Sequence, residues 1–337
     1  MHISRATVGR FAGTPGVRRS IDPRFVPLAV TISLFVALST VGSLLYDGFF
    51  APQVFLNLLI DNAFLCIVAV GMTFVILTGG IDLSVGAVVA LTTMISAQLV
   101  GRYGVNPWLV FPLVLIIGAV FGMGQGYLVQ RFRLQPFIVT LAGMFLARGL
   151  CYVISTESIS ITDPVYAAIA QARVPLGEHA SLSVGAVLAI GVVIAGMWVA
   201  QRTQFGRTVY AIGGSESSAR LMGLPVDATV VRVYMLSGFC AALGGVAVTF
   251  YMQSGYSLHA VGLELDAIAA VVIGGTLLRG GVGYVLGTLF GVLILGTIQT
   301  LITFEGTLSS WWTRIAVGAL LLGFCLLQRL FEARRRY

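Results

Sequence analysis

The sequence predicts an all-α membrane protein with about ten transmembrane helices, both termini in the cytoplasm and two weakly related halves. Two features of composition predict this class. Hydrophobic residues make up 58% of the 337 residues and charged residues only 10%, whereas soluble domains carry about 25% charged residues. The mean hydropathy is +0.97. At about 20 apolar residues per span, this length fits roughly ten spans and leaves no separate soluble domain.

Ten apolar segments follow one another along the chain. We expect spans at residues 26–46, 54–78, 84–101, 107–129, 134–155, 181–200, 228–253, 264–278, 281–301 and 311–328. The eighth segment is short for a full crossing. Together they form one transmembrane domain, 26–328, between a basic N-terminal tail at 1–25 and a basic C-terminal tail at 329–337. No small-residue cleavage site follows the first segment, which indicates a retained signal anchor.

The distribution of arginine along the chain supports this topology and is the third observation that predicts the fold class. All 20 basic residues are arginine, and 16 of them fall in segments expected to be cytoplasmic. These are Arg5, Arg10, Arg18, Arg19, Arg24, Arg131, Arg133, Arg202, Arg207, Arg220, Arg232, Arg279, Arg329, Arg334, Arg335 and Arg336. Positive charge favours the cytoplasmic side, and a nine-span topology would place the C-terminal cluster outside. Both termini are therefore expected in the cytoplasm.

The composition also excludes several kinds of site. Without lysine the chain can hold neither a P-loop nor a lysine Schiff base. The four cysteines lie singly in apolar runs and the three histidines are scattered. We therefore expect no catalytic residue, no metal site and no cofactor. The net charge of +7 reflects membrane topology, and no basic stripe on a soluble face predicts a nucleic-acid partner.

A glycine pair and a carboxylate interrupt the apolar stretch 71–86. They are Gly79, Gly80 and Asp82. Hydrocarbon disfavours unpaired backbone and charge, so such a break faces protein or a wet cavity. A weak internal repeat aligns 75–86 with 270–281 and pairs Gly79 with Gly274. Glycine-broken segments at corresponding positions of two halves point to a transport site.

We predict that these breaks, together with two polar residues of the second segment, line a path for a polar solute. The residues are Asp61, Asn62, Gly79, Gly80, Asp82, Ser84, Gly274, Gly275 and Thr276. For Asp82 the alternative is a helix N-cap, helped by Ser84. For Asp61 and Asn62 the alternative is hydrogen bonding between helices, worth about 1 kcal/mol per bond.

A second polar group surrounds the outer end of the seventh segment. Gln253, Tyr256, Glu264 and Asp266 are expected to form an outer gate or a docking surface. The alternative for the two acids is interaction with the dipole of the eighth helix. Arg148, within the fifth segment, is expected to pair with an acid or to extend toward the interface.

Residues 201–227 form the longest internal cytoplasmic segment, and they contain helix signals. Ser215 is suited to an N-cap with Glu216 in the first turn, while Gly223 and Pro225 mark the end. The pattern predicts an amphipathic helix of about two turns. A mere connection needs no capped helix, so this one indicates a docking element.

Three motifs resemble those of permease subunits of sugar ABC importers of the ribose/xylose/arabinose/galactose type. They lie at 79–86, 205–214 and 272–283, and the resemblance runs from about residue 25 to 328. It implies a multi-pass protein of the bacterial inner membrane, in contact with lipid, that has no ATPase site of its own. It also implies three partners: an ABC ATPase with P-loops, an extracytoplasmic sugar-binding protein, and a second homologous permease in a heterodimer or homodimer.

The same resemblance implies an ATPase coupling role for part of the cytoplasmic segment, namely Phe205, Gly206, Arg207, Gly213, Gly214, Ala219, Arg220 and Gly223. Residues 61–65, 262–269 and 306–312 are similar to permeases of galactofuranose importers, which implies a monosaccharide substrate. The alternative function is an ion-coupled secondary transporter of a small polar solute. Such a transporter also uses broken helices, and it would need an essential intramembrane acid pair.

Overall fold

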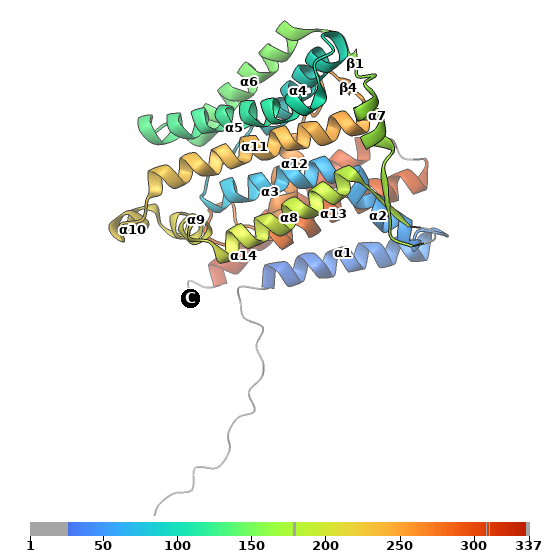
Figure 1. Ribbon diagram of the computed structural model, residues 1–337. Helices are drawn as coiled ribbons and strands as arrows, with labels where there is room; N and C mark the ends of the chain where they lie inside the picture. Colours follow the sequence, from blue (N-terminus) through green and yellow to red (C-terminus); the bar gives the residue numbers. More distant parts are fainter. Residues whose placement is uncertain (1–25, 178–179, 308, 310, 335–337) are drawn as a thin grey trace, which may run out of the picture.

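The computed structural model describes residues 26–177, 180–307, 309 and 311–334. The predicted N-terminal tail, 1–25, and the last three residues of the predicted C-terminal tail, 335–337, lie outside the described residues. The long helices lie side by side, with α9 and α10 at one end and α7, β1 and β4 at the other (Figure 1). These ends are named the α10 end and the α7 end.

Helices make up most of the described chain. They are α1 (Val26–Leu45), α2 (Pro52–Asp61), α3 (Ala63–Leu77), α4 (Val85–Ser96), the π-helix η1 (Ala97–Arg102), α5 (Pro107–Phe132), α6 (Pro136–Ile154), α7 (Pro164–Gln171), α8 (Val184–Arg202), α9 (Gln204–Gly214), α10 (Glu216–Leu221), α11 (Val226–Met252), α12 (Leu263–Ile273), α13 (Val285–Glu305) and α14 (Trp311–Arg334). Two short antiparallel pairs join β1 (Ile159–Ser160) to β4 (Ser254–Gly255), and β2 (Arg173–Pro175) to β3 (Ser181–Ser183).

Every expected apolar segment contains a helix, but not every segment is one straight span. Within the described residues, seven helices are long and apolar enough to cross a membrane, or up to eight if α2 and α3 count as one bent span. The bend between α2 and α3 is 59°. Helix α12 has only 11 residues, as its short segment suggested. An all-α multi-pass fold is thus confirmed, whereas ten spans stay a prediction.

Local sequence explains where many helices begin. Proline occupies the first turn of α2, α5, α6 and α7, where its missing N–H removes no helical hydrogen bond. Side chains cap other starts: Asn106 accepts from the Trp108 N–H of α5, and Ser183 accepts from the Ala186 N–H of α8. The residues that mark these helix starts are adjacent to them in the sequence.

Helix α11 runs through the centre of the fold and packs most extensively against α5, α3 and α4. Small residues allow the closest approach. A Cβ added at Gly122 of α5 would lie 2.1 Å from the Tyr234 carbonyl oxygen, and one at Gly118 would lie 2.5 Å from the Gly238 carbonyl oxygen. Van der Waals packing through small residues is the usual way for membrane helices to associate. The core therefore lies where α3, α4 and α11 meet.

Both ends of the described chain lie at the α10 end. At the start of α1, Pro27 packs against Gly275, and the Thr31 hydroxyl donates to the Ile273 carbonyl at 2.7 Å. Helix α14 ends on the same side (Figure 1). This arrangement fits an even number of crossings.

Candidate functional site

The first break, residues 78–84, joins α3 to α4 in the interior of the protein. Its carboxylate, Asp82, is 1% exposed. One oxygen accepts from the Ser84 N–H at 2.9 Å and from the Ser84 hydroxyl at 2.7 Å. The other accepts from the Ser237 hydroxyl of α11 at 2.7 Å. Asp82 thus fixes the turn before α4 and ties it to α11. Ser84 is the N-cap residue of α4 and no side chain caps that start, so the capping alternative for Asp82 is wrong and its role is to hold the break.

Gln125 of α5 completes this cluster. Its side-chain oxygen lies 3.1 Å from the Ser84 hydroxyl, while its amide nitrogen has no hydrogen-bond partner among the described residues. The hydroxyl of Tyr234, also buried, has no partner among them either. Buried polar groups are normally paired, so these two unpaired donors are unusual. The Gln125 amide packs against Gly143 and the Tyr234 hydroxyl against Gly80. Neither residue was predicted, because neither carries a charge or a local motif.

Glycine turns end α3 and α12 in the same way. The Gly80 N–H donates to the Val75 carbonyl across Gly79 (φ +81°), and the Thr276 N–H donates to the Val271 carbonyl across Gly275 (φ +89°). Only glycine adopts such φ values easily, and this pattern is a Schellman motif. Gly79 therefore corresponds to Gly275, one residue beyond the Gly274 that the sequence alignment paired with it.

The turn after α3 and the loop after α12 meet α9, a segment expected to belong to the ATPase coupling loop but not expected to be a helix. The Gly281 N–H donates to the Leu77 carbonyl at 2.9 Å. A Cβ added at Gly213 of α9 would lie 1.9 Å from that carbonyl oxygen and 2.2 Å from the Gly281 nitrogen. Only glycine fits there. We name the contact of 77–80, 279–283 and 210–214 the glycine junction.

Tyr210 fastens α9 to the same junction. Its hydroxyl donates to the Gly283 carbonyl at 2.7 Å. Burial, with a smaller effect of Tyr284, raises the pKa of Tyr210 to about 12. The phenol therefore keeps its proton, and so its donor, throughout the physiological range. Gly206 lies at the other end of α9, where the chain turns tightly after α8. It approaches the Ala200 carbonyl so closely that a side chain would not fit.

Helix α10 has the caps that the sequence predicts. The Ser215 hydroxyl accepts from the Ser218 N–H at 3.3 Å, and Gly223 (φ +75°) ends the helix. Ala219 is fully buried, whereas Leu221 is 89% and Met222 66% exposed. Arg207 and Gly214 are exposed on α9. The α10 end thus presents a capped helix with an apolar tip.

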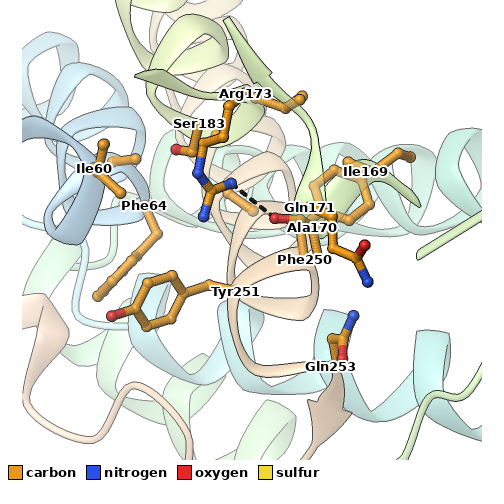
Figure 2. Close-up of a pocket in the computed structure, with 14 residues that line it drawn as sticks. Ile60, Phe64, Ile169, Ala170, Gln171, Arg173, Ser183, Phe250, Tyr251 and Gln253 are labelled. Atoms are coloured by element: carbon orange, nitrogen blue, oxygen red, sulfur yellow. Dashed lines mark hydrogen bonds between the residues drawn. The ribbon is translucent and has the colours of Figure 1, made fainter. Parts of the chain in front are cut away.

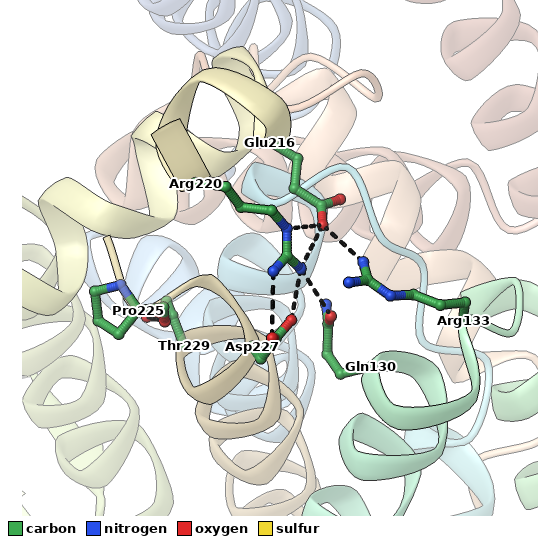
Figure 3. Close-up of polar contacts among 7 residues, drawn as sticks. All are labelled: Gln130, Arg133, Glu216, Arg220, Pro225, Asp227 and Thr229. Atoms are coloured by element: carbon green, nitrogen blue, oxygen red, sulfur yellow. Dashed lines mark hydrogen bonds and ion pairs between the residues drawn. The ribbon is translucent and has the colours of Figure 1, made fainter. Parts of the chain in front are cut away.

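Charged residues hold α10 against the bundle (Figure 3). Arg220 donates to Glu216 at 2.8 Å and to both oxygens of Asp227 at the start of α11. Arg133, after α5, approaches Glu216 at 3.4 Å. Hydrogen bonds from Arg220 to Asp227, and then to Glu216, raise the pKa of Arg220 above its usual value. Exposed pairs contribute little one by one, but this network fixes the position of α10.

A cavity of about 300 Å³ connects this network to the first break. Its lining includes Gly79, Gly80, Tyr234, Arg133 and Glu216. It opens at the α10 end and is bounded inside by Tyr234, whose hydroxyl is itself buried. A passage for a polar solute needs such a lining.

The second break, residues 253–262, joins α11 to α12. The Arg148 guanidinium of α6 donates to the carbonyls of Ser257 at 2.6 Å and His259 at 2.9 Å. Arg148 was expected to pair with an acid or to extend toward the interface. It interacts electrostatically with Glu264 but makes no ion pair of its own among the described residues. Main-chain oxygens take the place of the acid because the break leaves them without helical partners.

The four residues predicted to form an outer gate or docking surface do not lie together. Gln253 adopts a left-handed conformation (φ +48°) at the end of α11, and Tyr256 packs against His259. Glu264 lies against Gly86 at the start of α4, where a Cβ would be 2.3 Å from its carboxylate. Asp266 instead lines a groove of about 510 Å³ between α12, α13 and α14.

The predicted path residues likewise fall into three places. Asp61 is exposed at the bend and interacts with Tyr251, whereas Asn62 is buried and donates to the Leu58 carbonyl. Helix α3 separates these two residues from the Gly79–Ser84 break, and Gly274–Thr276 lie beyond the glycine junction. The alternative of hydrogen bonding between helices fits Asp61, which bonds Tyr251 of α11, whereas among the described residues Asn62 bonds only within α2 and packs against Gly296 of α13.

A further cavity of about 310 Å³ opens at the α7 end (Figure 2). Phe64, Phe250 and Tyr251 form its apolar lining, and Gln253 and Arg173 supply polar groups. The Arg173 guanidinium is held by the Ala170 carbonyl at 2.8 Å. In the described part of the chain, no group of three His, Cys, Asp or Glu side chains could hold a metal ion.

Comparison with known proteins identifies the family. Residues 54–325 match the model of the family described as "Branched-chain amino acid transport system / permease component". The inner membrane ABC transporter permease protein YjfF of Escherichia coli is 52% identical, over 91% of this chain and 92% of its own. The fructose import permease protein FruG of Bifidobacterium longum is 42% identical over 92% of each chain.

A third relative is the ribose import permease protein RbsC of Bacillus subtilis, 40% identical over 88% of this chain and 91% of its own. No solved structure matches the chain. The relatives confirm a multi-pass protein of the inner membrane that is a transport component. The chain therefore belongs to this permease family, as one of the permease subunits of sugar ABC importers.

Proposed function

We propose that this chain forms the translocation path for a monosaccharide, galactofuranose in the first instance, in an ATP-driven importer. An extracytoplasmic binding protein delivers the sugar, a second homologous permease completes the path, and ATPase subunits dock at the α10 end. The relatives named for fructose and ribose support a monosaccharide. Galactofuranose rests on the motif resemblance at 61–65, 262–269 and 306–312.

One observation carries the docking proposal: α10 is rigidly held yet presents apolar side chains to solvent. Arg220 and Ala219 anchor it, whereas Leu221 and Met222 are among the most exposed large apolar residues. Exposed apolar groups beside charged ones mark protein interaction sites. Arg131, Arg202 and Arg207 lie at this end, which supports its placement in the cytoplasm, where the ATPase is.

In this proposal α9 transmits the conformational change driven by ATP from α10 to the translocation path. Helix α10 follows α9 directly, and α9 contacts the glycine junction through the Gly213 backbone and the Tyr210 hydroxyl. A displacement of α10 by the ATPase thereby moves the turns that end α3 and α12. The Asp82 cluster and its cavity lie directly behind those turns. The permease contributes differential exposure of the solute and no chemistry of its own.

The test is co-purification of the tagged chain from its native membrane in mild detergent, with partners identified by mass spectrometry. Leu221→Asp places a charge on the apolar tip, and we expect at least about a tenfold loss of ATPase recovery, comparable to loss of an interface hot spot. Leu134→Asp is the matched control, because Leu134 is exposed at the same end but outside α10. It should leave recovery unchanged.

Two outcomes would overturn the proposal. Equal ATPase recovery with Leu221→Asp and Leu134→Asp would remove α10 as the docking site. Recovery of the chain alone, active for solute uptake in liposomes without ATP, would establish an ion-coupled secondary transporter instead. Competition between labelled galactofuranose, ribose and fructose in the intact complex then decides the substrate.

A further inference from the structure

The exposed faces of the bundle differ in polarity. On α5 and α6, large exposed side chains are apolar, among them Ile116 at 60%, Phe145 at 66% and Val153 at 82%. Such a face suits lipid. The groove between α12, α13 and α14 is different, because Asp266, Gln299 and Arg314 line it.

These polar residues belong to membrane-embedded helices. Gln299 and Thr303 lie on α13 toward its Glu305 end, and Arg314 lies one turn into α14. Charged side chains on a lipid-facing surface are costly, and they normally face water or protein. Asp266 and Arg314 attract each other electrostatically but form no ion pair within the described residues. Their hydrogen-bonding capacity remains available.

The groove has the composition of a carbohydrate site. Its volume, about 510 Å³, lies within the range of about 300–1,000 Å³ typical of small-molecule sites. Trp311, which lines it and is 70% exposed, offers a flat face to the apolar C–H side of a sugar ring. Asp266 accepts hydrogen bonds, Arg314 donates them, and Gln299 and Thr303 do both. Sugar hydroxyls need this mixture.

We propose that this groove is a monosaccharide-binding site on the α7 side of the path, with the sugar ring on Trp311 and its hydroxyls bound by Asp266, Gln299 and Arg314. This inference rests on the proposed function, which identifies the ligand as a monosaccharide. Its position at the α7 end, opposite α10, makes it the point at which the chain receives the sugar. A shallow, partly exposed site of this kind binds loosely, as release into the path requires.

Water access to the groove tests the first step without assuming transport. In the complete complex in native membranes, Gln299→Cys should react with a membrane-impermeant sulfonated maleimide. Ile116→Cys, on the apolar face, is the control and should not react. The parent chain supplies the background, in which Cys66, Cys151 and Cys240 are buried and Cys325 is partly exposed. If Gln299→Cys is as unreactive as Ile116→Cys, the groove is not aqueous and the inference fails.

Protection by sugar tests the second step. D-ribose, D-fructose and galactofuranose are added in turn before the maleimide, and at least one should slow the labelling of Gln299→Cys several-fold. Labelling that none of the three slows would overturn the groove as a sugar site.

Uptake kinetics then separate this inference from the proposed function. Trp311→Ala should raise KM for the transported sugar about tenfold with little change in kcat, as expected for lost binding. Trp311→Phe should restore most of the affinity, and Trp312→Ala, outside the groove lining, should leave KM unchanged. Normal KM with Trp311→Ala refutes the groove site. Absence of ATP-driven sugar uptake by the parent complex refutes the proposed function instead.

Discussion

The two breaks that interrupt the helices are held by opposite means. The first break, 78–84, is held by one of its own side chains, because Asp82 accepts hydrogen bonds from Ser84 and Ser237. In the second, 253–262, the break supplies only main-chain carbonyls, and Arg148 of α6 supplies the donors. Both breaks are thus tied to distant helices, but the charged group that holds the first break belongs to the break itself, whereas the charged group that holds the second belongs to α6.

The largest effect should come from removing the carboxylate of the first break. Asp82→Ala leaves two buried donors, the Ser84 N–H and the Ser237 hydroxyl, without an acceptor, each worth about 1–3 kcal/mol, whereas the Ser84 hydroxyl still has the Gln125 oxygen. We expect a loss of roughly 4 kcal/mol in the free energy of unfolding, seen as a lower midpoint of thermal unfolding in detergent. Asp82→Asn retains one acceptor oxygen and should lose about half as much. Equal midpoints for both variants and the parent would show that the carboxylate does not hold the break.

A smaller effect is expected where the first break begins, at the glycine junction. Gly213→Ala brings a methyl group against the Leu77 carbonyl and should cost about 3 kcal/mol, the upper range of overpacking. Gly214→Ala makes the same change one residue later, where nothing lies within 4 Å. Its midpoint should stay within the small range of surface substitutions. If the two alanines behave alike, α9 does not pack on the junction as described.

The second break should respond least in stability and most in local mobility. Arg148→Met removes two hydrogen bonds, each charge-assisted, but also removes a charge from the membrane. The net loss should be about 2 kcal/mol. Hydrogen exchange should rise in 253–262 and stay unchanged in 78–84. Arg102→Met, an exposed arginine of η1, is the control. Faster exchange in both breaks would show that Arg148 stabilises the fold generally.

The contrast explains what could be read from the sequence. Apolar segments, the Ser215 cap and the Gly223 stop are local signals that predicted helices, and the structure confirms them. The prolines that begin four helices are local signals of the same kind. The Asp82 break was recognisable because its glycines, carboxylate and serine stand within six residues. The partners of Arg148 are peptide carbonyls, which every residue carries, so no pattern of side chains reveals them.

Other features could not be predicted from the sequence because they also lack a local side-chain signal. The bend at Asn62 has no proline or glycine, and the single glycine of the π-helix η1, Gly101, does not distinguish a π-helix from an α-helix. Helix α9 was hidden because its packing depends on the absence of a side chain at Gly213, which sequence alone cannot distinguish from a flexible loop. The clustering of Gln125, Ser84 and Ser237 required three separate helices to be placed in space.

Arg148 has a consequence for how this protein can diversify. Because it binds peptide oxygens, its hold on the outer loop is indifferent to the side chains at positions 257 and 259. Ser257 is buried and leaves room only for a small side chain, but the partly exposed position 259 can change without loosening the loop, provided that the backbone course persists. The exposed side chains of this loop are therefore free to change while its scaffold stays constant, so a new surface need not require a new fold.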